Sequence, residues 1–491
     1  MKVLLKLFSL KFLAAILGVT FSILQIRYFG ASRLIEIYFA AQSLVYIVTS
    51  LTQSGQLSEI FLPVYHQLNA IKARMGFKAL NLILSRMLIF GLLLTVAVFF
   101  LTPYIIQLTV PGFEPSDQEF ATLIFRVLLP YLLLQIINSF FINILNAEEK
   151  FGRAELLGLI NSALNVLSLI VFFPYLGIWA LVVSLLLGKC IEFLFYLVQL
   201  AKLGYKPAFI WRLEGFDHTE FFKAARSTVG YAVSTQTYTM VLTASISYLP
   251  EGSFAIFKYL QNLSSKIQNL VVQPFVTIFF TLYSKSLDSM DYLNDLFQKN
   301  MKSLLAINAF LIISIYLLGE QAIEVIWGGD KFQGDDVQLA YNFFQFNAIA
   351  ILIGSINLMY RKMSVADGKG KMLYRYWTVS QLLSALFSYL LIYLFDINGL
   401  LFVIPMNVLL LTIATYIVYK KDSIILNFNY FDRDILILSA LVFVAIFIQF
   451  YFEFEAKFSL EFFIRIFITT LLCSYPIYLA IKTYRKVFVR F

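Results

Sequence analysis

Two lysines and several amide side chains share one face of an apolar segment near the middle of the chain. Lys258, Asn262 and Lys266 follow one another at intervals of four residues, which places them on the same side of a helix, with Gln261 beside them. At about 1.5 Å per residue, the two lysines lie roughly 12 Å apart along the helix axis. Two cations and several amides, with few carboxylates, suit an anionic or polyhydroxylated ligand.

A second group of ionisable and polar residues lies near the N-terminus. Arg27, Arg33 and Glu36 cluster where two apolar segments meet, and Gln53 ends the second of these segments. Ionisable side chains inside membrane segments are costly unless they face an interior cavity. We therefore expect Arg27, Glu36 and Gln53 to contribute to the same ligand site. Snorkelling of the arginines to the membrane interface is an equally good interpretation.

Other charged residues inside apolar segments have simpler interpretations. Lys189 and Glu192 lie three residues apart, and we expect them to pair with each other. Arg126 and Arg465 lie near the ends of apolar segments, where snorkelling to the interface is expected. None of these four residues is assigned to the ligand site.

The remaining motifs favour structural roles over catalysis. The Asp-Arg-Asp sequence at 432–434 has the form that glycosyltransferases use to hold a metal and a sugar nucleotide, but a helix cap is the favoured role. The Gly-Lys-Gly-Lys turn at 368–371 lacks the spacing of a phosphate-binding loop, so we expect no nucleotide hydrolysis. With 2 cysteines and 2 histidines, we predict no metal site and no cofactor, and we assign no catalytic residue.

The composition places all of these groups in a membrane. The 491 residues are 60% hydrophobic and 14% charged, and the mean hydropathy is +0.80, whereas a soluble domain is about 25% charged. Apolar runs of around 20 residues, long enough to cross about 30 Å of hydrocarbon, recur from end to end. We predict an all-α polytopic membrane protein with about 14 transmembrane helices, and we expect no nucleic-acid partner.

The loops between these runs alternate in charge, which indicates their orientation. Basic residues collect in every second loop, beginning with the N-terminal segment, whereas acidic residues dominate the other loops. Because Lys and Arg collect on the cytoplasmic side, we predict that both termini are cytoplasmic. The predicted spans are 7–27, 34–53, 79–101, 119–145, 153–173, 177–200, 223–248, 254–280, 303–326, 337–360, 374–395, 399–419, 434–452 and 461–481.

Short motifs recur along the chain at an offset of about 220 residues, which indicates an internal repeat. The segment 147–150 parallels 366–369, and 177–179 parallels 399–401. We predict a lobe of six helices at 1–200, a cytoplasmic interfacial linker at 201–222 and a second lobe of six helices at 223–421. The segment 422–491 holds the last two helices.

The order of several motifs resembles the MurJ/MviN flippases of the multidrug/oligosaccharidyl-lipid/polysaccharide exporter superfamily. The motifs are Arg-Tyr-Phe-Gly at 27–30, Gly-Gln-Leu-Ser-Glu-Ile-Phe-Leu-Pro-Val-Tyr at 55–65, Val-Pro-Gly-Phe at 110–113 and Ile-Leu-Asn-Ala at 144–147. The resemblance covers the first twelve spans and implies two lobes, with a lipid-tail groove formed by the last two helices. It also implies alternating-access flipping of an undecaprenyl-diphosphate-linked saccharide, typically lipid II, in peptidoglycan biosynthesis at the bacterial cytoplasmic membrane.

The chain departs from this family at charged positions. Where lipid II flippases carry charged pairs in the first, second and eighth helices, this sequence has Phe21-Ser22, Thr49-Ser50 and Gln261-Asn262. Only the acidic residue that opens the second helix is kept, as Glu36. We hypothesise that Lys258 and Lys266 take over the diphosphate. A flippase for surface-polysaccharide repeat units also fits.

Two further interpretations stay open. A cation-coupled multidrug exporter of the same superfamily would depend on buried carboxylates, for which Glu36 is nearly the only candidate. A membrane glycosyltransferase or ligase generally needs a large outer loop or a constellation of catalytic carboxylates. For the flippase interpretation we expect coupling to the membrane potential or to a monovalent cation.

Overall fold

Long helices make up the part of the chain that the structure describes, as the recurring apolar runs predict. Hydrocarbon offers no water to backbone groups, so each N–H and C=O must find its partner within the protein, which a helix provides. Contacts divide the chain into two compact units, Met1–Ala255 and Ile256–Phe491. The computed structural model describes residues 2–52, 61, 65–70, 74–148, 150–213, 218–273, 276, 279, 290–421, 428–451 and 460–488.

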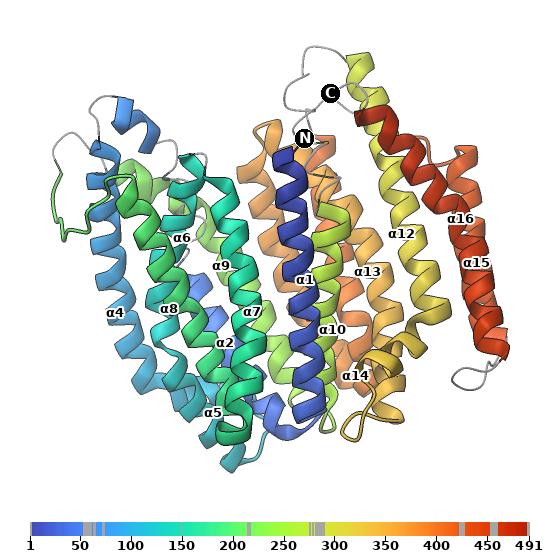
Figure 1. Cartoon of the computed structure of the whole chain (residues 1–491), viewed down its shortest axis with the longest axis horizontal. Coiled ribbons are helices and arrows are strands. Elements are labelled where there is room, and N and C mark those ends of the chain that lie inside the picture. The colour runs from blue at the N-terminus through green and yellow to red at the C-terminus, as the bar shows by residue number, and fades with distance from the viewer. Residues whose placement is uncertain are drawn as a thin grey trace. The chain divides into compact units, whose positions relative to one another are not determined.

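In the first unit, helices that are far apart in sequence pack side by side (Figure 1). The helix α1 packs on α7, α2 packs on α5 and α9, and α8 packs on α6 and α7. These contacts bury the apolar faces that the sequence pattern predicts. The helices are α1 (Lys2–Phe29), α2 (Arg33–Leu51), α4 (Met75–Thr109), α5 (Pro115–Leu128), α6 (Pro130–Ala147), α7 (Phe151–Leu176), α8 (Trp179–Lys202) and α9 (His218–Ile246).

In the second unit, α12 is the common partner of three other helices. It packs on α13, α15 and α16, and α13 packs in turn on α14. Figure 1 shows α12 in yellow beside the two red C-terminal helices. The elements are α10 (Ser253–Ile267), which starts in the first unit, η1 (Gln268–Val272), α12 (Met290–Trp327), α13 (Asp335–Ala366), α14 (Gly370–Lys420), α15 (Arg433–Tyr451) and α16 (Leu460–Phe488).

Within the described residues, the helices cover the predicted spans with two differences. Of the described helices, 10 are long and apolar enough to cross a membrane. The predicted span 119–145 is divided between α5 and α6, because Pro130 opens a new helix. The predicted spans 374–395 and 399–419 both lie within α14, which reverses at Asp396. The all-helical fold is confirmed, whereas the number of crossings stays a prediction.

The reversals before the predicted spans 177–200 and 399–419 use the same backbone geometry. Gly177 has φ 54° and ψ −125°, and Asp396 has φ 49° and ψ −130°. The sequence comparison matched Gly177 with Gly399, whereas the structure places the equivalent angles at Asp396. A side chain in this region is strained by about 1–3 kcal/mol, so the second reversal stores strain that the glycine avoids in the first.

A second recurring feature follows α6 and α13. The N–H of Lys150 donates to the carbonyl of Leu145 (2.8 Å), and the N–H of Lys369 donates to the carbonyl of Ser364 (2.9 Å). The two bonds lie about 220 residues apart, the offset of the repeat in the sequence. Recurrence of these helix-ending bonds supports the repeat. The lobe bounds 1–200 and 223–421, the linker 201–222 and the segment 422–491 stay a prediction.

We predict opposite stability changes for substitutions at the two reversals. Asp396→Gly relieves the backbone strain and raises the thermal unfolding midpoint, whereas Gly177→Ala introduces strain of about 1–2 kcal/mol and lowers it. No atom lies within 4 Å of a Cβ added at Gly177, so the backbone angle alone causes the loss. Unfolding in detergent, followed by circular dichroism, measures both changes.

Gly158→Ala is the matched control. An added Cβ at Gly158 also meets nothing within 4 Å, but this glycine lies inside α7, where alanine favours the helix by about 1 kcal/mol. Gly158→Ala should therefore leave the midpoint unchanged or raise it. Equal losses in the two glycine variants would contradict the proposed strain.

Candidate functional site

The polar face predicted near the middle of the chain lies on α10. The turn before this helix uses Gly252 at a φ of 92°, which favours glycine. Lys258, Gln261 and Lys266 are half-buried and Asn262 is exposed, so the stripe has one partly open face. The first two turns of the helix pack into the protein through Phe254, Ala255, Ile256, Phe257, Tyr259 and Leu260, all of which are buried.

The helix widens directly after this stripe. Gln268–Val272 form a π-helical turn, a feature that is frequent at functional sites. Gln268 lies against α13, since a Cβ added to Gly354 would come within 3.2 Å of its Nε2 atom. The Oγ atom of Ser264 is buried without a hydrogen-bond partner among the described residues. The sequence pattern did not reveal this turn, because one wide turn leaves the composition unchanged.

The carboxylate of Glu36 caps the start of α10. The side chain is 1% exposed, and its Oε1 atom accepts hydrogen bonds from the N–H groups of Gly252 (2.9 Å), Phe254 (3.0 Å) and Ala255 (3.4 Å). Its Oε2 atom accepts a hydrogen bond from Nη1 of Arg33 at 2.7 Å. A negative group at a helix N-terminus satisfies amides that have no partner within the helix.

Arg33 extends this contact to two more acidic residues. Its Nε atom lies 3.7 Å from Oδ2 of Asp117, and its backbone N–H donates to Oε1 of Glu251 at 2.6 Å. Its guanidinium lies 4.5 Å from the ring centre of Phe113. Burial raises the pKa of Asp117 more than the nearby Arg33 lowers it. We call Arg33, Glu36, Asp117 and Glu251 the Glu36 clasp.

The structure describes one of the other two residues predicted near the N-terminus. Arg27 is exposed at the end of α1, and Gln53 lies outside the described residues. Glu36 is the member of the predicted set that the structure places against the first turn of α10. A ligand-binding role for Arg27, Glu36 and Gln53 stays a prediction.

A second ionic cluster joins α12, α15 and α16. Nζ of Lys302 lies 2.8 Å from Oδ2 of Asp432 and 3.3 Å from Oδ2 of Asp434. The hydroxyl of Tyr475 donates to Oδ1 of Asp434 at 2.8 Å. Oδ1 of Asp432 accepts the N–H of Asp434 at 3.0 Å, which confirms the predicted cap. We call Lys302, Asp432, Asp434 and Tyr475 the Lys302 cluster.

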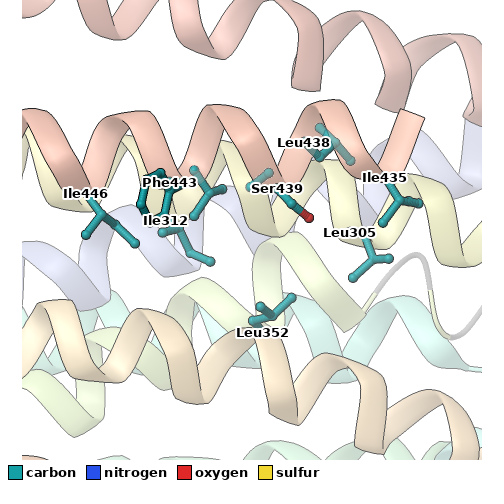
Figure 2. A pocket seen from close by; sticks show the side chains of 10 residues that line it. Leu305, Ile312, Leu352, Ile435, Leu438, Ser439, Phe443 and Ile446 are labelled. Carbon is teal, nitrogen blue, oxygen red and sulfur yellow. The ribbon is translucent and has the colours of Figure 1, made fainter. Parts of the chain in front are cut away.

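An apolar groove begins about one helical turn from this cluster. It has a volume of about 280 Å³ and is lined from α12, α13 and α15. Figure 2 shows Leu305, Ile312 and Leu352 facing the side chains of α15 across it. Ser439 supplies the one polar side chain among the described residues of its lining. A groove of this kind suits a hydrocarbon ligand.

Two predictions about charged residues have different outcomes. Nζ of Lys189 lies 2.7 Å from Oε2 of Glu192, which confirms the expected pair. Snorkelling of Arg465 is wrong, because this residue is 3% exposed and donates from Nη1 to the carbonyl of Leu317 at 3.4 Å. Its place near the end of α16 suggested the interface, whereas packing against α12 buries it.

Loss of the Glu36 carboxylate should strongly destabilise the protein. Glu36→Ala leaves buried amides and Arg33 without their acceptor, so we expect the free energy of unfolding to fall by about 3 kcal/mol or more. Glu251→Ala is the control, because Glu251 is exposed and its contact should contribute below about 1 kcal/mol. Unfolding in mixed detergent micelles measures both, and similar losses would contradict a capping role for Glu36.

The Lys302 cluster should lose its contribution to stability in acid. The hydrogen bond from Lys302 lowers the pKa of Asp432, so the pair stabilises the fold above the unfolded-state pKa of about 3.9. This contribution disappears as pH falls through the lower folded-state pKa. Lys302→Met should therefore lower the thermal midpoint at neutral pH, and the difference from the natural protein should narrow below about pH 4.

Lys299→Met provides the control on the same helix. Lys299 pairs with Asp295, whose side chain is 50% exposed, so its loss should change the midpoint little at any pH. A difference for Lys302→Met that stays constant across the acid range would contradict the role of Asp432.

Comparisons with known proteins agree with this architecture. The sequence model of the lipid II flippase MurJ family matches residues 26–469. A probable lipid II flippase MurJ of Buchnera aphidicola subsp. Baizongia pistaciae is 23% identical over 368 residues, which cover 72% of this chain and 70% of that protein. A probable lipid II flippase MurJ of Borreliella burgdorferi is 23% identical over 352 residues, which cover 70% of this chain and 68% of that protein.

Solved structures show the same fold. A lipid II flippase MurJ in an inward closed conformation matches with a TM-score of 0.79 and 19% identity, over 98% of this chain and 99% of that one. An inward-facing multidrug resistance MATE family transporter of the MOP superfamily matches with a TM-score of 0.63 and 16% identity, over 85% of this chain and 96% of that one. Since the family match spans most of the sequence, this chain belongs to the lipid II flippase MurJ family.

Proposed function

We propose that this protein moves an undecaprenyl-diphosphate-linked saccharide from the inner to the outer leaflet by alternating access. As a member of its family, the chain is a transporter of the bacterial inner membrane and not an enzyme. The polar face of α10 carries the proposal, because it presents Lys258 and Lys266 beside amide side chains. We propose lipid II or the repeat unit of a surface polysaccharide as the substrate.

The chemistry of α10 fits a diphosphate that carries sugars. The two ammonium groups lie roughly 12 Å apart along the helix axis. Each ammonium provides three hydrogen-bond donors and acts on phosphate as a compact charge. Asn262, exposed between the lysines, offers both donors and an acceptor to saccharide hydroxyls. In this proposal, the lysines replace the charged pairs that lipid II flippases carry elsewhere.

The apolar groove between α12, α13 and α15 fits the prenyl tail. Its lining is almost entirely hydrocarbon (Figure 2), and since the bilayer is already apolar, the tail would gain mainly from van der Waals packing. Asp434 of the Lys302 cluster directly precedes Ile435, at one end of this groove. We propose that the tail follows the groove while the headgroup reaches the polar face of α10.

For energy, we propose coupling to the membrane potential or to a monovalent cation. A negative potential inside the cell favours outward movement of an anionic headgroup. The gain in free energy is about 2.3 kcal/mol for each elementary charge that crosses a potential of 100 mV. The proposal needs no nucleotide hydrolysis. It places both chain termini on the cytoplasmic side, where the basic loops meet the anionic lipid surface.

The partners that hold Glu36 and Glu192 argue against cation-coupled drug export as the main activity. Glu36 already accepts hydrogen bonds from backbone amides and from Arg33. Glu192 is paired with Lys189. A carboxylate that couples export to a cation must exchange partners, and the two described above are held by partners within the first unit.

The Asp-Arg-Asp motif does not favour a glycosyltransferase. Asp432 caps its own helix and pairs with Lys302. Asp434 accepts a hydrogen bond from Tyr475. Both carboxylates therefore contribute to the junction of α12, α15 and α16, and a metal ion would have to displace Lys302.

Competition between substrates tests the proposal directly. In native mass spectrometry of the purified protein with lipid II and an undecaprenyl-diphosphate polysaccharide unit, we expect stable binding of at least one of them. Lys258→Gln and Lys266→Gln should each weaken that binding about ten-fold or more, because a charge-assisted hydrogen bond contributes roughly 1.5–3 kcal/mol. Lys299→Gln, on α12, should leave binding unchanged. Failure to bind either lipid would contradict the proposal.

A second pair of variants tests the proposed tail site independently of the headgroup site. Ser439 is exposed and lines the groove, so Ser439→Phe should fill it and weaken binding of the complete lipid. Ala440 is also exposed but is absent from the lining, which makes Ala440→Phe the matched control. Equal effects of the two phenylalanines would contradict the groove as the tail site.

A further inference from the structure

The described part of the connection from α8 to α9, residues 203–213, runs along α4 and is held by side chains of α4. Nδ2 of Asn81 donates to the carbonyl of Lys206 at 2.9 Å. Nη2 of Arg86 donates to the carbonyl of Trp211 at 3.2 Å. These bonds fix the path of the segment 203–213, which forms a turn and a bend and has no regular helix or strand.

A cavity of about 440 Å³ lies between this segment and the helices α4, α6 and α8. The hydroxyl of Tyr205 donates to Oδ1 of Asn81 at 2.7 Å, and Oγ of Ser85 accepts the N–H of Ile210 at 3.1 Å. Since the polar groups of the lining are bonded to the protein, the surface left for a ligand is apolar. The apolar lining includes Leu84, Leu88, Ile137, Phe141, Phe193 and Leu197.

We call the segment 201–213, which borders the cavity, and Arg86 on α4 the rim of the cavity, and this rim is basic. Lys202, Lys206 and Arg212 are all exposed, and the segment 201–213 contains no acidic residue. The guanidinium of Arg86 lies 5.8 Å from the ring centre of Trp211, which adds a fourth positive charge. Glu148, which follows α6, accepts a hydrogen bond from the hydroxyl of Tyr65 at 2.7 Å.

Two aromatic rings lie on the outer surface of the same segment. Phe209 is 71% exposed and Trp211 is 54% exposed, and their rings stack at 6.4 Å with an angle of 17°. Exposed aromatic rings next to basic side chains are typical of the interface between hydrocarbon and lipid headgroups. The surface therefore combines an apolar cavity, a cationic rim and an aromatic edge.

We propose that this surface is a binding site for an anionic phospholipid. One acyl chain occupies the cavity, and the phosphate lies against Arg86, Lys206 and Arg212. A water-soluble anion does not fit this combination, because the cavity offers it no polar group. A zwitterionic lipid lacks the net charge that the rim attracts. The site shares no residue with the polar face of α10, so it is not the proposed transport site.

Lipid titration of the delipidated full-length protein tests the proposal. Native mass spectrometry compares phosphatidylglycerol with phosphatidylcholine of the same acyl chains. We expect tighter binding of the first phosphatidylglycerol molecule, and a loss of about five-fold in Arg86→Gln, the factor for one basic residue near an anionic surface. Lys371→Gln, at a basic turn in the second unit, should leave the preference unchanged. Equal affinity for the two lipids would overturn the proposal.

A fluorescence measurement locates the bound chain. In a protein whose other tryptophans (Trp179, Trp327 and Trp377) are changed to Phe, brominated phosphatidylglycerol should quench Trp211 more than brominated phosphatidylcholine does. Ala208→Phe fills the cavity without removing a charge and should abolish this excess. The proposed site would be overturned if inorganic phosphate relieved the quenching of Trp211. It would also be overturned if Ala208→Phe left the quenching unchanged. Neither result would alter the test of the α10 lysines, so the two proposals fail separately.

Discussion

The buried contact between Glu36 and the start of α10 is the constraint on which much of this structure depends. The first amides of a helix have no partner within the helix, and in hydrocarbon each unsatisfied group costs several kcal/mol. Glu36 supplies the acceptor from α2. This contact fixes the first turn of α10 within the first unit.

Two other groups of charged residues in the described structure follow the same rule of local satisfaction. Lys189 neutralises Glu192 within α8, and Lys302 joins the carboxylates of the Asp-Arg-Asp motif at the junction of three helices. These pairs stabilise helix contacts and leave little charge for ligands. The polar face of α10 differs in kind, because it remains half-open and leads into a π-helical turn. That contrast distinguishes a candidate binding surface from structural ion pairs.

The sequence predicted features that depend on neighbours along the chain. Helical spans, the cap at Asp432 and the pair of Lys189 with Glu192 all follow from local spacing. Contacts between distant segments did not follow, since nothing in the composition links Glu36 to Gly252, or Lys302 to Asp432. Arg465 shows the same limit, because its burial depends on the packing of α16 against α12. The polar face of α10 was predicted, whereas the π-helical turn beyond it was not.

The segment after α8 shows how a path and a surface can be specified by different residues. Asn81, Ser85 and Arg86 hold this segment through its backbone groups at positions 206, 210 and 211. Side chains at those three positions are therefore not needed to define the route. Over evolutionary time, their identities can change and alter what the surface recognises while the loop keeps its course. The α4 helix therefore determines the path of the segment, and the side chains of the segment determine what its surface binds.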